Sequence, residues 1–249
     1  MAACGLGESC DIHGGGDDLE FPHDENEIAQ SEAATGKPYA KSWLHCGMIT
    51  INGEKMSKSL GNFFTIREVL EKYHPEVVRY LLIASHYRSP INYSEDNLRE
   101  SKAALERFYN ALKGLPEAEP AAADEFVARF SAAMDDDFNT ASACSVLFEL
   151  AREVNRLRDS DIQAAAALAA RLKSLAALLG VLQLEPEAFL QADAAGRVDA
   201  AAVEALIEAR LAARAAKDWA ASDQIRDQLS AMGVLLEDAK GVTTWRLAD

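Results

Sequence analysis

About half of this chain, from Thr65 to about Leu190, carries its apolar side chains at helical spacing. Thr65 and Glu68 have the spacing of a capping box, and Ser94 precedes an acidic first turn. Further helices are expected at about 124–134, 140–158 and 161–179. Each such helix must bury its apolar stripe against another helix. The sequence therefore predicts a helical bundle over residues 65–190.

The segments on either side of this bundle are mixed in character. Residues 1–64 combine glycine-rich turns, short apolar runs and aromatic residues, as α/β domains do. Within them, a short apolar strand enters a tight turn at Asn52-Gly53. Residues 199–249 predict two helices followed by two short strands. The expected fold class is therefore α/β plus all-α, with a small mixed α/β domain at the end.

Composition limits the classes of function. Forty acidic residues against 25 basic ones give a net charge of −15, which excludes a nonspecific nucleic-acid binder, so any RNA contact must use local basic patches. The N-terminal residues lack the basic and apolar regions of an export signal, and no apolar run approaches the length of a membrane span. Four cysteines without a CxxC pair are typical of a reducing compartment. We expect a cytoplasmic monomer with no membrane partner.

The strongest local motif is the pentapeptide KMSKS at residues 55–59, directly after the Asn-Gly turn. Lys55 and Lys58 are three residues apart and separated by small side chains. On a loop that closes, they can neutralise the charge that develops as pyrophosphate leaves a nucleoside triphosphate. A solvated surface loop has a similar composition, so the pentapeptide alone leaves both interpretations open.

A second motif offers metal ligands. His23 and Glu27 are four residues apart after Pro22, which suits the first turn of a helix. Residues at this spacing share one helix face, so an imidazole and a carboxylate can hold one Zn²⁺. A plain surface ion pair is the alternative that spacing alone favours.

Near this motif lies a glycine run preceded by a histidine. Gly14, Gly15 and Gly16 let a backbone approach a nucleotide closely, His13 stands beside them, and Asp18 can accept hydrogen bonds from ribose hydroxyls. The alternative is an ordinary glycine turn next to a histidine with its own partners.

The last segment carries a basic stripe. Arg210, Arg214 and Lys217 fall on one face of a predicted helix, and Arg226 extends the set. Trp245 offers an aromatic surface on which an unpaired base can stack. These five residues are the candidate RNA contacts. A solvated basic face around a core tryptophan is the alternative.

Four segments together resemble one enzyme family. KMSKS is similar to the second signature of class I aminoacyl-tRNA synthetases. Residues 11–27, DIHGGGDDLEFPHDENE, resemble the form DIHGGGxDLxFPHHENE of the cysteine-specific member. HYRSPINYS at 86–94 and MDDDFNT at 134–140 resemble the same family. Because several long motifs occur in the right order over essentially the whole chain, the sequence is identified as similar to the C-terminal portion of cysteinyl-tRNA synthetases.

The resemblance implies an architecture and an activity. Residues 1–64 would be the C-terminal part of a Rossmann-like catalytic domain with the KMSKS loop. Residues 65–190 would contact the tRNA stem, and 199–249 would read the anticodon. The intact enzyme would be a cysteine–tRNA ligase, activating cysteine with ATP and transferring it to its tRNA. Lys55 and Lys58 would be its catalytic lysines, with Lys58 on the ATP phosphates.

The resemblance also assigns ligands and shows departures. His23 and Glu27 match the family's histidine and glutamate zinc ligands, and the segment from His13 to Asp18 lies around the adenylate. The family's two cysteine ligands and its HIGH tetrapeptide are expected upstream of Met1, outside this sequence. Asp24 stands where the family motif has a second histidine. Zinc can select cysteine over serine because it binds a thiolate well and a hydroxyl poorly.

Two other functions stay open. One is a non-catalytic tRNA-binding fragment. The other is a cysteine:amine ligase of the mycothiol-biosynthesis type, which would not need the basic segment 199–249.

Overall fold

The computed structural model describes residues 5, 7–56, 65–120, 125–191, 200–239 and 242–247. The chain forms two compact units, Met1–Gln183 and Leu184–Asp249. This boundary falls inside the predicted range 65–190, and the three predicted domain ranges remain a prediction.

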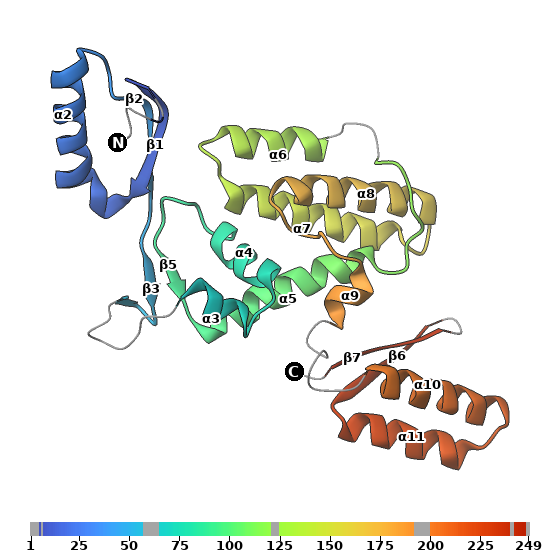
Figure 1. Ribbon diagram of the computed structural model, residues 1–249. Helices are drawn as coiled ribbons and strands as arrows, with labels where there is room; N and C mark the ends of the chain where they lie inside the picture. Colours follow the sequence, from blue (N-terminus) through green and yellow to red (C-terminus); the bar gives the residue numbers. More distant parts are fainter. Residues whose placement is uncertain are drawn as a thin grey trace. The chain divides into compact units, whose positions relative to one another are not determined.

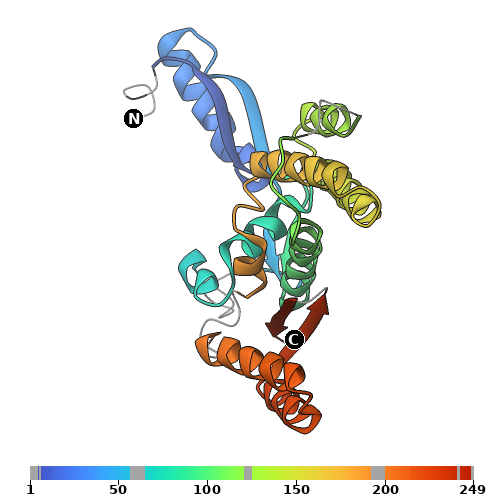
Figure 2. The same cartoon turned by 90° about the vertical axis from the view of Figure 1, so that its right-hand side faces the viewer.

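The first unit begins with a strand–helix–strand motif. It consists of β1 (Cys10–Gly16), the short helices η1 (Asp17–Leu19) and η2 (Glu20–Asp24), α2 (Glu25–Thr35) and β2 (Ala40–Cys46). The strands β1 and β2 are parallel, with His13 paired to Trp43 and Gly15 to His45. Helix α2 lies alongside the two strands (Figures 1 and 2). This arrangement is a βαβ unit, the building block of nucleotide-binding folds.

A second small sheet follows. Its strand order is β4 (Glu54–Lys55), β3 (Ile49–Ile51) and β5 (Ile91–Tyr93), with β3 antiparallel to β4 and parallel to β5. Asn52 and Gly53 join β3 to β4 with φ values of 50° and 82°. Positive φ at both positions is what a tight hairpin turn requires, so the predicted Asn-Gly turn is confirmed.

The helical bundle occupies the rest of the first unit. Its helices are α3 (Ile66–Leu70), α4 (Pro75–Ile83), α5 (Glu95–Leu112), α6 (Glu125–Asp135), α7 (Thr140–Leu157) and α8 (Ile162–Leu178). The capping box of Thr65 and Glu68 is present, and the Ser94 side chain accepts from the Asn97 amide. Both predicted helix starts are therefore confirmed.

The bundle has a dense apolar core. The side chains without solvent exposure include Leu105, Phe108, Leu147, Leu150, Val154 and Leu172. Each buried side chain of this size contributes about 1.5–3 kcal/mol through the hydrophobic effect. The bundle is therefore held together mainly by apolar burial between α5, α7 and α8.

One buried carboxylate, that of Glu76, connects three segments of the bundle. Glu76 on α4 is 6% exposed. It accepts hydrogen bonds from the Tyr109 hydroxyl at 2.8 Å, the Leu182 amide at 3.1 Å and the Gln183 amide at 2.9 Å. A buried carboxylate is tolerated when its lone pairs are filled, so Glu76 ties α4 to α5 and to the segment after α8.

The second unit pairs two helices with a hairpin. Its elements are α9 (Pro186–Leu190), α10 (Ala200–Ala215), α11 (Trp219–Ala231), β6 (Val234–Ala239) and β7 (Val242–Leu247), the last two antiparallel. Its core contains Val203, Ile207, Leu229, Val234 and Trp245. The two predicted helices and two predicted strands of this segment are confirmed.

The described residues agree with the expected fold class, α/β followed by all-α and by a small mixed domain. None of the helices in the described ranges combines the length and apolar character that a bilayer crossing requires.

Candidate functional site

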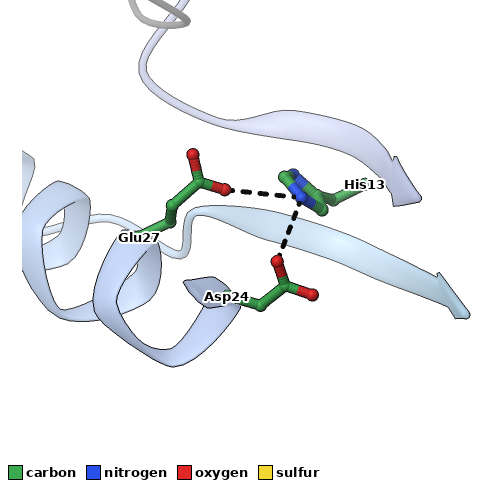
Figure 3. A group of neighbouring side chains, drawn as sticks. All are labelled: His13, Asp24 and Glu27. Carbon is green, nitrogen blue, oxygen red and sulfur yellow. Dashed lines mark ion pairs between the residues drawn. The ribbon is translucent and has the colours of Figure 1, made fainter. Parts of the chain in front are cut away.

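Three side chains from three different elements meet beside the β1–β2 pair (Figure 3). His13 lies on β1, Asp24 ends η2, and Glu27 is in the first turn of α2. The Nε2 atom of His13 is 3.6 Å from Asp24 Oδ1 and 3.4 Å from Glu27 Oε2. One ligand atom from each of the three residues lies within 4.8 Å of the other two. The cluster therefore offers one nitrogen and two carboxylate oxygens to a common point.

Asp24 is the buried member of this cluster. The residue is 2% exposed. Its Oδ2 accepts a hydrogen bond at 2.8 Å from Nε2 of His45 on β2, since a carboxylate in its charged form can only accept. Its Oδ1, the oxygen facing His13, has no hydrogen-bond partner among the described residues. Asp24 thus replaces the second histidine of the family motif with a carboxylate. One of its oxygens is hydrogen-bonded to His45, and the other has no hydrogen-bond partner among the described residues.

Aromatic rings pack against the imidazoles of His13 and His45. The ring centroid of Trp43 lies 4.6 Å from that of His13 and 6.2 Å from that of His45. The rings of Trp43 and His45 are nearly parallel. Tyr39 is buried, and its hydroxyl donates to Glu27 Oε2 at 3.5 Å. Burial raises the pKa of Tyr39, and the negative charge of Glu27 raises it further. Tyr39 therefore remains a hydrogen-bond donor to this carboxylate over the physiological pH range.

The predicted metal pair is close to this cluster. Nε2 of His23 is 3.8 Å from Glu27 Oε2, in the expected i, i+4 relation. The His23 side chain is 55% exposed, whereas that of His13 is 20% exposed. Sequence reasoning found His23 and Glu27 but missed the contribution of His13, Asp24 and His45 to one cluster. A usable signal was the two-residue spacing between Trp43 and His45, which puts both on one face of a strand.

The glycine run lies in a strand and is not the glycine turn that was the alternative to a nucleotide-binding segment. Gly14, Gly15 and Gly16 are extended residues of β1, paired with β2. A Cβ atom on Gly16 would lie 2.7 Å from Oδ1 of Asp18. This oxygen is the end of a flexible side chain, so the contact does not by itself require glycine at position 16. The binding of ATP by these glycines, His13 and Asp18 remains a prediction.

Beside this passage lies an open depression of 410 Å³. It is lined by Asp17, Asp18, Glu20, Phe21 and Glu25. Four of these five residues carry carboxylates, so the depression by itself repels free phosphate.

The KMSKS loop is described only at its base. Lys55 belongs to β4, whereas Lys58 lies outside the described residues, so the predicted roles of both lysines remain predictions. The Asn92 side chain supports the turn before the loop, because its Oδ1 accepts from the Gly53 amide at 2.9 Å. The HYRSPINYS segment thereby anchors the strand pair from which the loop departs.

The same segment contacts the MDDDFNT turn. Arg88 donates through Nε to Asp137 Oδ2 at 2.6 Å, and the Tyr87 hydroxyl donates to Oδ1 at 2.8 Å. The Arg88 guanidinium and the Tyr87 hydroxyl hold the pKa of Asp137 below its usual value. Two motifs about 50 residues apart in sequence are therefore joined by an ion pair and a hydrogen bond.

The predicted tRNA residues in the second unit are of two kinds. Arg214, Lys217 and Arg226 are exposed, and Arg226 pairs with Asp223 at 3.1 Å. Arg210 is 8% exposed and Trp245 is 3% exposed. The indole N–H of Trp245 donates to Glu204 Oε1 at 2.7 Å.

This burial corrects the expectation that Trp245 stacks on a base. Its ring belongs to the core between the helices and the hairpin, where it has no open face. Arg210 likewise is not part of an exposed basic stripe. The physical reason is that α10 buries one face against α11 and the hairpin. Arg210 lies on that face of α10, and Trp245 of β7 belongs to the core that the face covers.

Comparison with known proteins matches three family models to consecutive parts of the chain. These are the tRNA synthetases class I (C) catalytic domain over residues 1–103, the DALR domain over residues 129–183 and the cysteinyl-tRNA ligase anticodon binding domain over residues 200–246. A solved structure, the LeuRS–tRNA–LeuAMS ternary complex of Agrobacterium radiobacter K84, matches with a TM-score of 0.50 at 19% identity. The match covers 71% of this chain and 28% of the chain in the solved structure, and the likeness concerns the fold alone.

Curated relatives are much closer in sequence. The chain is 86% identical over 249 residues to the cysteine–tRNA ligase of Pseudomonas aeruginosa (strain LESB58) and 78% identical to that of Azotobacter vinelandii (strain DJ). Each match covers 100% of this chain and 54% of the relative, so the chain spans about half the length of these relatives. The order of the matched domains and this identity lead to one conclusion: the chain belongs to the cysteinyl-tRNA synthetase family of class I aminoacyl-tRNA synthetases.

Proposed function

We propose that this chain acts as the C-terminal part of a cysteine–tRNA ligase, which activates cysteine with ATP and transfers it to its tRNA. The observation that carries the proposal is the meeting of His13, His23 and Glu27 at one place beside β1. These residues come from the DIHGGG and FPHDENE segments, which the family resemblance assigns to the adenylate and to the metal.

The proposal assigns a role to each part of the catalytic segment. Lys58 contacts the ATP phosphates with support from Lys55, which supplies positive charge as pyrophosphate leaves. The backbone of Gly14 to Gly16, with His13 and Asp18, borders the adenylate. The supporting observation is that these glycines, His13, Asp18 and the two metal candidates lie on adjoining elements, β1, η1, η2 and α2.

Zinc is part of the proposed function. His23 and Glu27 fit two corners of a metal site because their donor atoms are 3.8 Å apart and both are accessible. When bound, the metal supplies preference for a thiolate over a hydroxyl. His45 holds Asp24 on the other side of the cluster, and Tyr39 donates a hydrogen bond to Glu27.

The second unit is proposed to bind the anticodon arm. Arg214, Lys217 and Arg226 are its exposed basic candidates. If one of these side chains binds a phosphate, its replacement by alanine should weaken tRNA binding and reduce the salt dependence of the affinity. We further propose that the protein is a cytoplasmic monomer.

The direct test is cysteine-dependent exchange of pyrophosphate into ATP by the 249-residue chain with Zn²⁺ added. Exchange that requires cysteine, fails with serine and is lost in Lys58→Ala supports the proposal. Lys173→Ala, on the helical bundle, is the matched control and should leave exchange unchanged.

A tRNA-binding fragment without catalysis is the second candidate, and the match of residues 200–246 to the anticodon binding domain supports it. Cysteine tRNA bound without any exchange would establish it. Deletion of residues 199–249 distinguishes the tRNA ligase and the tRNA-binding fragment from a cysteine:amine ligase. Only the first two functions require this segment, so the deletion should weaken tRNA binding. Unchanged tRNA affinity after the deletion would contradict the anticodon role.

A further inference from the structure

We propose that Asp137 is a positioning residue for the β3–β4 hairpin, which ends at Lys55, the first residue of the KMSKS motif. Its carboxylate holds the side chains of Tyr87 and Arg88, and the backbone of these two residues holds the start of the hairpin. The importance of the hairpin for ATP rests on the proposed function. The connection itself consists of contacts within the first unit, so it can be measured without any ligand.

The turn between α6 and α7 fixes the direction of the Asp137 carboxylate. Asp137 and Phe138 both have left-handed backbone, with φ values of 52° and 54°. This conformation is unfavourable for residues other than glycine and persists where the surroundings determine it. Here the Phe138 amide donates to the Met134 carbonyl at 3.1 Å, and the Asn139 amide donates to the Ala133 carbonyl at 3.1 Å. The end of α6 therefore holds the turn in place.

Three donor groups from one short segment converge on this carboxylate. Arg88 donates through Nε to Oδ2 at 2.6 Å and through Nη2 to Oδ1 at 3.3 Å, and the Tyr87 hydroxyl donates to Oδ1 at 2.8 Å. The Arg88 guanidinium also lies over the Tyr87 ring, 5.0 Å from its centroid. A two-pronged contact between a guanidinium and a carboxylate fixes orientation as well as distance. Asp137 therefore fixes both side chains against the bundle.

The backbone of residues 87–89 lies directly on the chain that enters the hairpin. Gly47, two residues before β3, donates its amide to the Tyr87 carbonyl at 2.8 Å. A Cβ atom on Gly47 would clash with the carbonyl group of Ser89 and would lie 2.7 Å from the carbonyl oxygen of Arg88. These are backbone atoms, which cannot swing aside as the end of a side chain can. A displacement of residues 87–89 therefore displaces Gly47 as well.

Two further contacts continue into the hairpin. The Ile91 amide donates to the Met48 carbonyl at 2.9 Å, after which β5 runs parallel to β3 (Figure 1). At the hairpin turn, Oδ1 of Asn92 accepts from the Gly53 amide at 2.9 Å. A two-stranded hairpin is marginally stable by itself, so its orientation depends on the segment that it packs against. Contacts therefore run without a break from Asp137 to the β3–β4 hairpin.

An ordinary surface ion pair is the alternative. The side chains of Arg88 and Asp137 are 49% and 44% exposed, and an isolated pair at such exposure contributes little to global stability. The two interpretations predict different results. A surface pair leaves the hairpin unaffected, whereas a positioning residue changes the opening of the hairpin and leaves the core of the bundle as it is.

The test is amide hydrogen exchange with mass spectrometry on the whole 249-residue chain and on Asp137→Asn. Asparagine also tolerates left-handed backbone, so this substitution removes the charge and leaves the turn. Amides of residues 47–54 should exchange about two- to fivefold faster, the range expected for the loss of a half-exposed ion pair. Amides of residues 146–154 in α7 should be unchanged. Asp136→Asn, the neighbouring carboxylate of the same turn, is the matched control and should change neither region.

A double variant shows whether the two side chains act through one contact. Arg88→Met should accelerate exchange of residues 47–54 to a similar extent, and the double variant with Asp137→Asn should exceed neither single change. In the pyrophosphate exchange assay, Asp137→Asn should lower kcat by a similar factor. The KM for cysteine should be unchanged, because Asp137 acts on the hairpin and not on the His23–Glu27 pair.

Four outcomes would overturn the inference. They are unchanged exchange of residues 47–54 in Asp137→Asn, equal acceleration in α7, additive effects in the double variant, and an unchanged kcat in an active chain. If the unmodified chain shows no pyrophosphate exchange, the proposed function fails, and hydrogen exchange alone decides the positioning role of Asp137.

Discussion

The strand–helix region of residues 7–56 and the helical bundle of residues 75–183 are organised in opposite ways. In the bundle, the fully buried side chains are mostly leucine, alanine, valine and phenylalanine. In residues 7–56, the buried residues are Cys10, Asp24, Tyr39 and Ile51. The bundle is held by apolar packing, whereas the strand–helix region is arranged around a buried carboxylate, two imidazoles and two aromatic rings.

The difference shows where stability and chemistry are located. A two-stranded parallel pair is a small element, and parallel strands are usually covered on both faces. Here Ile12 is 66% exposed and Phe21 is 77% exposed. Polar sites of this kind are commonly drawn from the less stable parts of a fold. We therefore expect the bundle to carry the stability of the first unit and the strand–helix region its candidate chemistry.

The largest expected effect is the loss of a core side chain. Leu147→Ala in α7 should lower the free energy of unfolding by about 2–5 kcal/mol because it leaves a cavity in a fully buried site. Ile12→Ala in β1 should change it by no more than about 0.5 kcal/mol. Urea denaturation followed by circular dichroism measures both, and equal losses would contradict the contrast between the regions.

The second effect concerns local opening. Backbone amides of β1 and β2 should exchange with deuterium about 100-fold faster than those of α7, a difference of about 2.7 kcal/mol in opening free energy. Hydrogen exchange with mass spectrometry on the metal-free chain measures this. Equal protection of the two regions would show that the strand pair opens only with the whole unit.

The third effect compares two thiols. Burial in the bundle raises the pKa of Cys144 from 9.0 to about 11, while Cys46 at the end of β2 is exposed. The raised pKa stabilises the fold fully below pH 9, and this contribution is lost as the pH rises towards 11. Iodoacetamide at pH 8 should label Cys46 and spare Cys144 until the chain is unfolded, as peptide mapping can follow. Early labelling of Cys144 would contradict its burial.

The smallest effect separates the two buried carboxylates. Glu76→Gln replaces an acceptor that serves three donors and should cost about 1–3 kcal/mol. Asp24→Asn keeps an oxygen that can bond to His45 and removes an oxygen that has no hydrogen-bond partner among the described residues. In the presence of EDTA it should therefore lower the free energy of unfolding by less than about 1 kcal/mol. Thermal unfolding with and without EDTA measures both. A larger cost for Asp24→Asn without metal would show that its charge stabilises the fold directly.

Local chemistry was the part of the fold that sequence reasoning could predict. The capping box of Thr65 and Glu68, the Ser94 cap and the Asn52-Gly53 turn involve neighbours within a few residues. Such interactions depend on short stretches of backbone, and helical periodicity located the bundle for the same reason. The His23–Glu27 pair was predictable because a helix turn alone brings the two residues together.

The remaining features depend on packing between segments distant in sequence. His45 reaches Asp24 only through the parallel register of β1 and β2, and Trp245 is buried only because the hairpin packs on α10 and α11. A one-residue change of register would turn every side chain of a strand to the other face, and no local pattern specifies that register.

The sequence by itself thus determined the class of fold, the helix starts, the tight turn and the family resemblance. Tertiary structure alone decided that Asp24 would be a buried carboxylate between two histidines and that Trp245 would be a core residue. The physical reason is that capping and periodicity act over one or two turns of chain, whereas burial and ligand geometry depend on which surfaces pack together.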